Sequence, residues 1–239
     1  MLKVAIHQIN YLPWIGFFSK IASADVYVVL DTAAYTRGSW INRNRIKVPP
    51  NRVVYLTIPI SRRFKGVPIK DVELPKDRKW ARNHWTTIKV SYNKAEFFNS
   101  YEEFFRRLYS DAEAGRYRRL AELNWDIVSY LFEELDINVD VVWASELDLP
   151  PGLKKTDLLI AILEAVGADT YISGMGGKKY LEEHKFDEHG IKLVYHEFKC
   201  PRYRQLWGDF VPNLSVIDLL FNEGERAKDI LAQTIVRLS

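Results

Sequence analysis

Cysteine is nearly absent from this sequence, since Cys200 is the only one among 239 residues. An intramolecular disulfide is therefore excluded, as is a metal cluster built on several cysteines. Long apolar runs are absent too, because segments such as 26–30 and 158–163 fall far short of the roughly 20 residues that a membrane-spanning helix needs. Residues 1–6 lack the charged start, apolar stretch and cleavage site of a secretory signal. We expect a cytoplasmic protein without a membrane span.

The signature motifs of several enzyme classes are missing as well. Neither the phosphate-binding pattern G-x-x-x-x-G-K-[ST] nor the dinucleotide pattern G-x-G-x-x-G occurs. The sequence has no H-E-x-x-H zinc motif, no EF-hand loop and no serine nucleophile elbow. His184 and His189 would need Asp187 and further ligands to hold a metal, so we predict no metal site.

Apolar and aromatic residues are plentiful. They make up 47% of the chain, with 7 Trp, 13 Tyr and 12 Phe, which excludes the low-hydrophobicity composition of disordered chains. No linker or long repeat divides the sequence, and one domain over residues 1–239 is ordinary for this length. We predict a single packed domain.

Positive charge is concentrated in one segment. Residues 32–70 contain nine Lys or Arg and no Asp or Glu, although the net charge of the whole chain is only +3. The rest of the chain is therefore net acidic. A basic segment in an acidic chain indicates a local anion site.

Apolar periodicity divides the chain into alternating strands and helices. Strands are expected at 3–7, 26–30, 53–60, 69–74, 139–143, 170–172 and 191–195, and helices at 14–24, 76–92, 101–109, 116–135, 156–166, 177–183, 215–221 and 225–238. Residues 32–52 show no period and are expected to form a long basic loop. Parallel β-α-β units assemble into an open sheet. We predict an α/β, Rossmann-like fold with a mostly parallel open sheet, flanking helices and an inserted helical section at about 76–136.

Polar side chains follow the first expected strands, at the edge where ligands bind in open α/β sheets. His7 ends the first strand, and the ordinary pKa of a histidine suits proton transfer. Asp31 ends the next strand and is expected to orient His7 or to bind an acceptor hydroxyl, which makes both residues catalytic candidates. The alternative is a purely structural His7. Candidate substrate-binding residues follow His7 at Gln8, Asn10, Tyr11 and Trp14.

Two further segments have the composition of ligand sites. The run at 39–45 mixes cationic and polar groups with Trp40, a combination that can bind phosphate and stack on a ring, and its candidates are Ser39, Asn42, Arg43 and Arg45. The turn Ser173-Gly174-Met175-Gly176-Gly177, followed by Lys178, allows close backbone approach to an anion. A solvated basic loop and a tight turn without a ligand are the alternatives.

Several long segments resemble the WbqC-like family. They are 7–16, 24–31, 39–47, 167–181, 203–205 and 214–224, and Ile9 stands where the family pattern usually has Pro. The resemblance implies a transferase-like step on an activated sugar in the biosynthesis of surface glycans such as the O-antigen of lipopolysaccharide. It adds Tyr180, Tyr203 and Gln205 to the candidate binding residues.

Two functions of different classes are compatible with these patterns. The first is a transferase that binds a phosphorylated donor, such as a nucleotide-sugar or an acyl or aminoacyl donor, and an amino or hydroxyl acceptor, with His7 as the base. It needs no cofactor, although Mg²⁺ accompanying a diphosphate donor stays open. The second is a non-catalytic nucleic-acid-binding protein that uses the basic 37–65 segment with Tyr35, Trp40 and Tyr55 as stacking groups. A third possibility, an interaction scaffold, is less favoured because polar residues occur at the strand ends.

Overall fold

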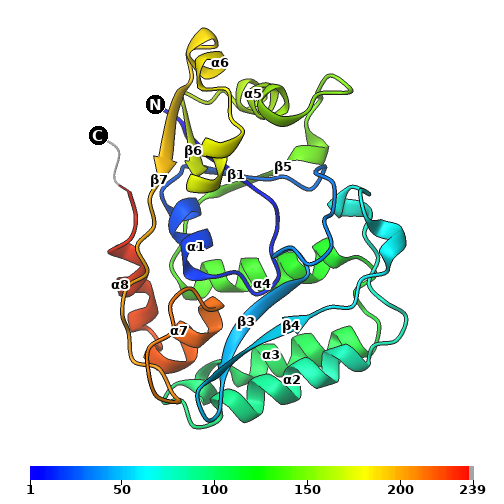
Figure 1. Ribbon diagram of the computed structural model, residues 1–239, viewed down its shortest axis with the longest axis vertical. Helices are drawn as coiled ribbons and strands as arrows, with labels where there is room; N and C mark the ends of the chain where they lie inside the picture. The colour runs from blue at the N-terminus through cyan, green and yellow to red at the C-terminus, as the bar shows by residue number, and fades with distance from the viewer. Residues whose placement is uncertain (237–239) are drawn as a thin grey trace.

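A computed structural model describes residues 1–236 and contains a five-stranded parallel sheet (Figure 1). The strands lie in the order β5-β2-β1-β6-β7. Their bounds are Lys3–His7 for β1, Val26–Val29 for β2, Asp140–Trp143 for β5, Thr170–Gly174 for β6 and Lys192–His196 for β7. Chain order reverses between β1 and β6, the switch point at which open α/β sheets bind ligands. This topology confirms the predicted Rossmann-like class.

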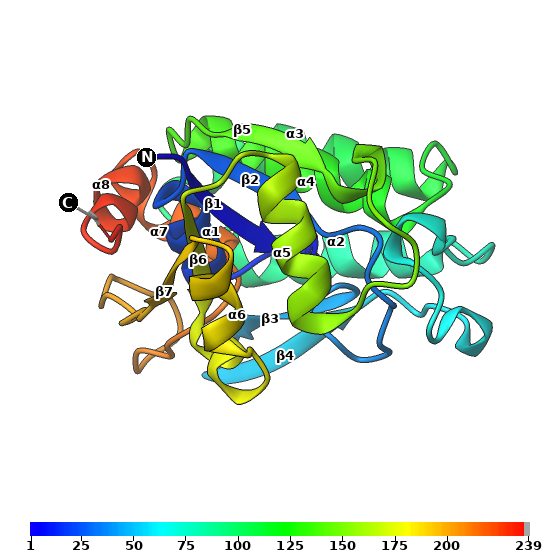
Figure 2. The same cartoon turned by 90° about the horizontal axis from the view of Figure 1, so that it is seen from above.

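Alternate side chains of the strands pack against helices on opposite faces of the sheet. On one face Val26 and Val28 contact α5 (Lys155–Ala165). On the other, Tyr27 and Val29 belong to the larger core that includes α1 (Ile15–Ala22). Figure 1 shows α5 on one side of the sheet and α1 on the other, and Figure 2 shows α5 crossing in front of β1. The apolar runs are thus buried on both faces, as parallel strands require.

The helical middle section is present between β4 (Arg52–Thr57) and β5. It consists of α2 (Lys79–Tyr92), α3 (Phe98–Glu113) and α4 (Leu120–Glu134), which bury apolar faces in the larger core. The remaining helices are α6 (Glu183–Glu188), α7 (Val216–Glu223) and α8 (Arg226–Ala232), with short 3-10 turns η1 (Arg62–Phe64), η2 (Ile69–Asp71), η3 (Ala144–Glu146) and η4 (Met175–Lys179). Within residues 1–236, every helix is too short or too polar to cross a membrane.

The basic segment was expected to be a loop up to residue 52, and this is wrong for its second half. Residues Arg43–Val48 form strand β3, which pairs antiparallel with β4 (Arg52–Thr57). The alternation is obscured because Asn44 and Lys47 are buried polar residues. The Asn44 amide donates to the backbone carbonyl of Leu12 at 2.7 Å, so the hairpin packs against the loop that follows β1.

Three other boundaries differ from expectation. Residues 69–74 do not form an edge strand, since η2 occupies their first half. The expected helix at 177–183 is replaced by η4, because the amides of Tyr180 and Leu181 both bond to the carbonyl of Gly177 and close a tight turn. The last helix ends at Ala232, and the final residues of the expected 225–238 helix lie outside the described part of the chain.

Candidate functional site

The carboxyl ends of β1 and β6 meet at a cavity of about 350 Å³, here called the switch-point cavity. Predicted residues from two distant parts of the sequence converge on it, together with a lysine that was not predicted. They are His7, Gln8, Ser173, Gly174, Gly176, Gly177 and Tyr180, with Lys20 as the addition. The fold therefore brings the histidine and the glycine-rich turn to one cavity.

His7 is a half-buried residue at the end of β1. Its Nδ1 lies 2.8 Å from the carbonyl oxygen of Gln8, which can only accept, so Nδ1 carries the proton and Nε2 keeps its lone pair. The ring packs edge-on against Phe17, with 5.1 Å between ring centroids. Burial, and then the charge of Lys20, lower the pKa of His7 to about 3. The imidazole is neutral at physiological pH.

Asp31 does not orient His7, and this expectation is wrong. The Asp31 carboxylate accepts hydrogen bonds from the amide of Ser145 at 3.0 Å and from its hydroxyl at 2.6 Å. Ser145 follows β5, on the side of β2 away from β1. Asp31 therefore lines a different cavity.

Lys20 lines the switch-point cavity and was not predicted from the sequence. Its side chain is only 5% exposed, and its Nζ donates to the carbonyl of Ile6 at 2.9 Å. Burial lowers the pKa of Lys20 to about 7, and within residues 1–236 no carboxylate counteracts the shift. The sequence offers one sign of its burial, because Lys20 is the single charged residue in the apolar segment Ile15–Ala22. A buried ammonium without a counter-ion favours an anionic ligand.

The 173–177 turn forms another part of the cavity wall. A Cβ at Gly177 would lie 2.3 Å from the Ser173 hydroxyl, so only glycine fits there. At Gly174 and Gly176 a Cβ would meet nothing within 4 Å, because both border open space. Tyr180 is half exposed and forms part of the cavity rim. In this turn Gly177 packs tightly against Ser173, whereas Gly174 and Gly176 border the cavity.

The basic 39–45 run does not reach the switch-point cavity. Arg45 donates from Nε to the carbonyl of Asn213 at 3.2 Å, and the Arg43 guanidinium stacks 4.7 Å from the centre of the Tyr55 ring. Asn42 is buried and donates to the carbonyl of Ile58. Ser39 is half-buried and accepts the Asn42 amide at its carbonyl. These contacts stabilise the hairpin region.

A separate cavity of about 220 Å³ collects other residues of the predicted set. It is lined by Trp14, Trp40, Asn44, Arg45 and Asn213. Asn10 and Tyr11 lie beneath the surface, at 3% and 0% exposure, and the Tyr11 hydroxyl bonds to Nδ1 of His84 at 2.8 Å. Asn10 and Tyr11 are thus part of the packing.

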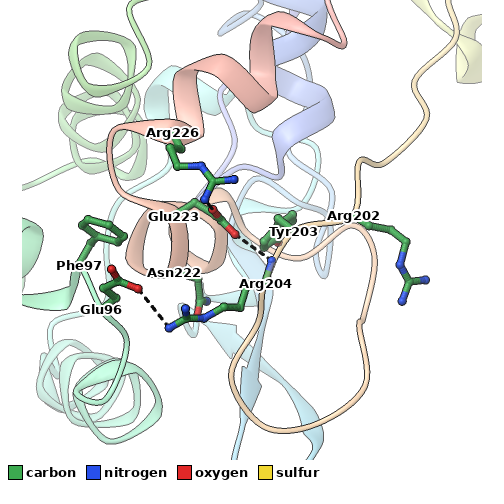
Figure 3. A pocket seen from close by; sticks show the side chains of 8 residues that line it. All are labelled: Glu96, Phe97, Arg202, Tyr203, Arg204, Asn222, Glu223 and Arg226. Atoms are coloured by element: carbon green, nitrogen blue, oxygen red, sulfur yellow. Dashed lines mark hydrogen bonds and ion pairs between the residues drawn. The ribbon is translucent and has the colours of Figure 1, made fainter.

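Figure 3 shows a third cavity, of about 500 Å³, whose wall includes Tyr203. Two of its three arginines pair with glutamates, Arg204 with Glu96 at 3.2 Å and Arg226 with Glu223 at 3.4 Å. The Tyr203 hydroxyl donates to Asp218 at 2.9 Å, while the Gln205 side chain bonds to the backbone of Val211. Tyr203 and Gln205 therefore hold the 200–213 segment and do not line the switch-point cavity.

Lys178 lies outside the switch-point cavity as well. Its Nζ is 4.9 Å from the centre of the Tyr195 ring. Among residues 1–236, no three His, Cys, Asp or Glu side chains gather as a metal site would require.

The fold defines an α/β protein with a cavity at the switch point of a parallel sheet. The chain belongs to the WbqC-like protein family, whose model matches residues 8–230. It is 32% identical over 232 residues to the protein named "Uncharacterized protein Rv1507c" of Mycobacterium tuberculosis, covering 97% of this chain and 98% of that one. No solved structure matches the chain.

Proposed function

We propose that the protein is a group transferase of surface-glycan biosynthesis that binds a phosphorylated donor in the switch-point cavity. Membership of the WbqC-like family supports the pathway, since the family name points to O-antigen-related biosynthesis. The observation that carries the proposal is the convergence of His7, Lys20 and the 173–177 turn on one cavity. Lys20 and His7 have separate roles in this cavity.

Lys20 supplies the anion recognition. Its ammonium is buried with one hydrogen bond to Ile6, so two of its three donors remain for a ligand. A phosphate beside it replaces the lost hydration and raises its pKa, which stabilises the charged form. The phosphate approaches the turn where Gly174 and Gly176 leave open space. The donor is therefore held by its charge, close to the backbone.

His7 is the group placed to handle a proton. Its Nε2 lone pair accepts a hydrogen bond from an acceptor hydroxyl or amine as that group attacks the donor. The low pKa of His7 makes it a weak base, and a bound anion nearby raises that pKa. Lys20 meanwhile stabilises the negative charge of the departing phosphate. These roles require the donor phosphate and His7 to share the cavity.

Calorimetric titration with UDP, a minimal part of a nucleotide-sugar, tests the proposal. Wild-type protein should bind UDP, and Lys20→Met should weaken binding about tenfold or more, the effect of losing a hydrogen bond to a charged group. Lys192→Met is the matched control, because Lys192 is exposed at the start of β7, away from the cavity. Equal UDP affinity in wild type and Lys20→Met contradicts the proposal.

One observation favours a second candidate, nucleic-acid binding by the hairpin region. Trp40 and Tyr55 are 43% and 51% exposed and their rings stack at 6.3 Å, with Arg43 over Tyr55. Tyr35 is buried and cannot take part, contrary to expectation. Binding of single-stranded oligonucleotide that weakens steeply with salt and is lost in Trp40→Ala would support this candidate. No oligonucleotide binding at low salt would eliminate it.

A further inference from the structure

A cavity of about 520 Å³ lies beside the switch-point cavity, at the carboxyl ends of β2 and β5, and is here called the acidic cavity. Its walls come from segments far apart in the sequence: the end of β2, η2, the start of α4, and η3 after β5. The walls include Asp31, Trp125, Trp143, Ser145 and Glu146. None of these five residues lines the switch-point cavity.

Two indoles form the apolar part of the acidic cavity. Trp125 and Trp143 meet edge to face, with ring centroids 5.5 Å apart and an interplanar angle of 70°. Both side chains are half-buried, so each keeps surface toward the cavity. Indole surfaces suit the carbon-bound hydrogens of a sugar ring and attract cations to their faces.

Carboxylates outnumber basic groups around the same space. Asp31, Asp71, Glu122 and Glu146 line it, against Lys70 and Arg119. This excess of negative charge repels phosphorylated ligands and favours a protonated amine. The acidic cavity is thus complementary in charge to the switch-point cavity.

Asp31 is the buried acceptor of the acidic cavity. It is 2% exposed, and its two hydrogen bonds both come from Ser145. A carboxylate offers about four acceptor positions, so roughly two remain. Asp31 forms no ion pair within residues 1–236. A buried carboxylate of this kind favours a ligand that donates hydrogen bonds, above all a charged one.

We propose that the acidic cavity binds an amino sugar. Its ring would pack on the indoles, its ammonium would face the carboxylates, and its hydroxyls would donate to Asp31. Calling this ligand the acceptor rests on the proposed transferase function, whereas the binding itself does not. Leu30 lines the switch-point cavity and Asp31 lines the acidic one, and adjacent Cα atoms are about 3.8 Å apart. Donor and acceptor would therefore bind at neighbouring strand ends, on either side of these two residues.

Calorimetric titration with three probes tests the assignment. D-glucosamine should bind at least about tenfold more tightly than D-glucose, which lacks the ammonium, and than glucosamine 6-phosphate, which adds negative charge. Asp31→Asn should weaken glucosamine binding about tenfold or more. Glu146→Gln tests an exposed residue of the wall, where a folding defect is not expected. Asp148→Asn removes one exposed charge outside the cavity and should leave the affinity unchanged.

Two results would overturn the assignment: equal affinity for glucosamine and glucose, or glucosamine binding unaltered in both Asp31→Asn and Glu146→Gln. The affinity of the switch-point cavity for UDP is measured separately in the same proteins. If UDP binds and glucosamine does not, the acidic cavity is wrongly assigned while the proposed function stands. If glucosamine binds through Asp31 and UDP fails to bind, the proposed function fails while the amino-sugar site stands.

Discussion

The Nζ of Lys20 donates a hydrogen bond to the backbone carbonyl of Ile6, 2.9 Å away, one residue before His7 at the end of β1. This contact holds a buried ammonium behind the histidine and within reach of the switch-point cavity. It links the two groups electrostatically, because the charge of Lys20 contributes to the low pKa of His7.

Lys20→Met should stabilise the protein at neutral pH, because it removes a buried charge. Since the folded pKa of about 7 lies below the ordinary value of 10.5, the unfolded chain binds the extra proton between these limits. Wild type should therefore gain stability relative to Lys20→Met by at most about 1.4 kcal/mol per pH unit above pH 7. Urea unfolding at pH 7, 8 and 9 measures this difference. A constant difference between the two proteins would contradict a buried Lys20 that titrates near neutrality.

UDP affinity should depend on the same proton. Because the anion requires a charged Lys20, whose pKa is about 7, the dissociation constant should rise by up to about tenfold per pH unit above pH 7. Calorimetry in buffers of different ionisation enthalpy should also detect proton uptake on binding at pH 8. In Lys20→Met both effects should disappear. Proton uptake that persists in this variant would assign the coupling to another group.

Gly177→Ala should destabilise the protein by about 1–3 kcal/mol, the range typical of overpacking. The new Cβ would lie 2.3 Å from the Ser173 hydroxyl and 2.8 Å from a methyl of Leu181. Gly176→Ala is the matched control, since its Cβ meets nothing within 4 Å and its stability should change little. Denaturant midpoints of the two variants provide the comparison. Equal midpoints would show that the turn is packed differently.

His7→Gln should make the protein less sensitive to acid. The folded pKa of His7, about 3, lies below the ordinary 6.5, so the unfolded chain binds a proton first as the pH falls. Wild type therefore loses stability between pH 6.5 and 3, by at most about 1.4 kcal/mol per unit, and the variant lacks this loss. His184→Gln changes an exposed histidine of α6 and serves as control. Identical acid unfolding of wild type and His7→Gln would contradict the burial of the imidazole.

The parallel sheet could be predicted from the sequence because its strands are short apolar runs, such as Val26–Val29, with helical periodicity between them. Strand β3 could not, since Asn44 and Lys47 interrupt its apolar pattern and find their partners far away in the chain. The Asn44 amide reaches Leu12, and the Lys47 ammonium reaches the carbonyl of Gly208. Local patterns do not encode such long-range hydrogen bonds.

The candidate site was predictable only in part, for a similar reason. His7 and the 173–177 turn follow strands directly, so the strand-end rule places both at the switch point. Lys20 looks like a surface lysine of a helix until the packing of α1 buries it. The pairing of Asp31 with Ser145 depends on which strand lies next to β2, and that order is a property of the assembled sheet.

A crystal structure of the protein with UDP would show directly where the phosphate binds. We expect a phosphate in the switch-point cavity, within about 3 Å of the Lys20 Nζ and next to Gly174 and Gly176. A phosphate bound instead at Arg45 or at Arg204, in either of the two arginine-lined cavities, would contradict it.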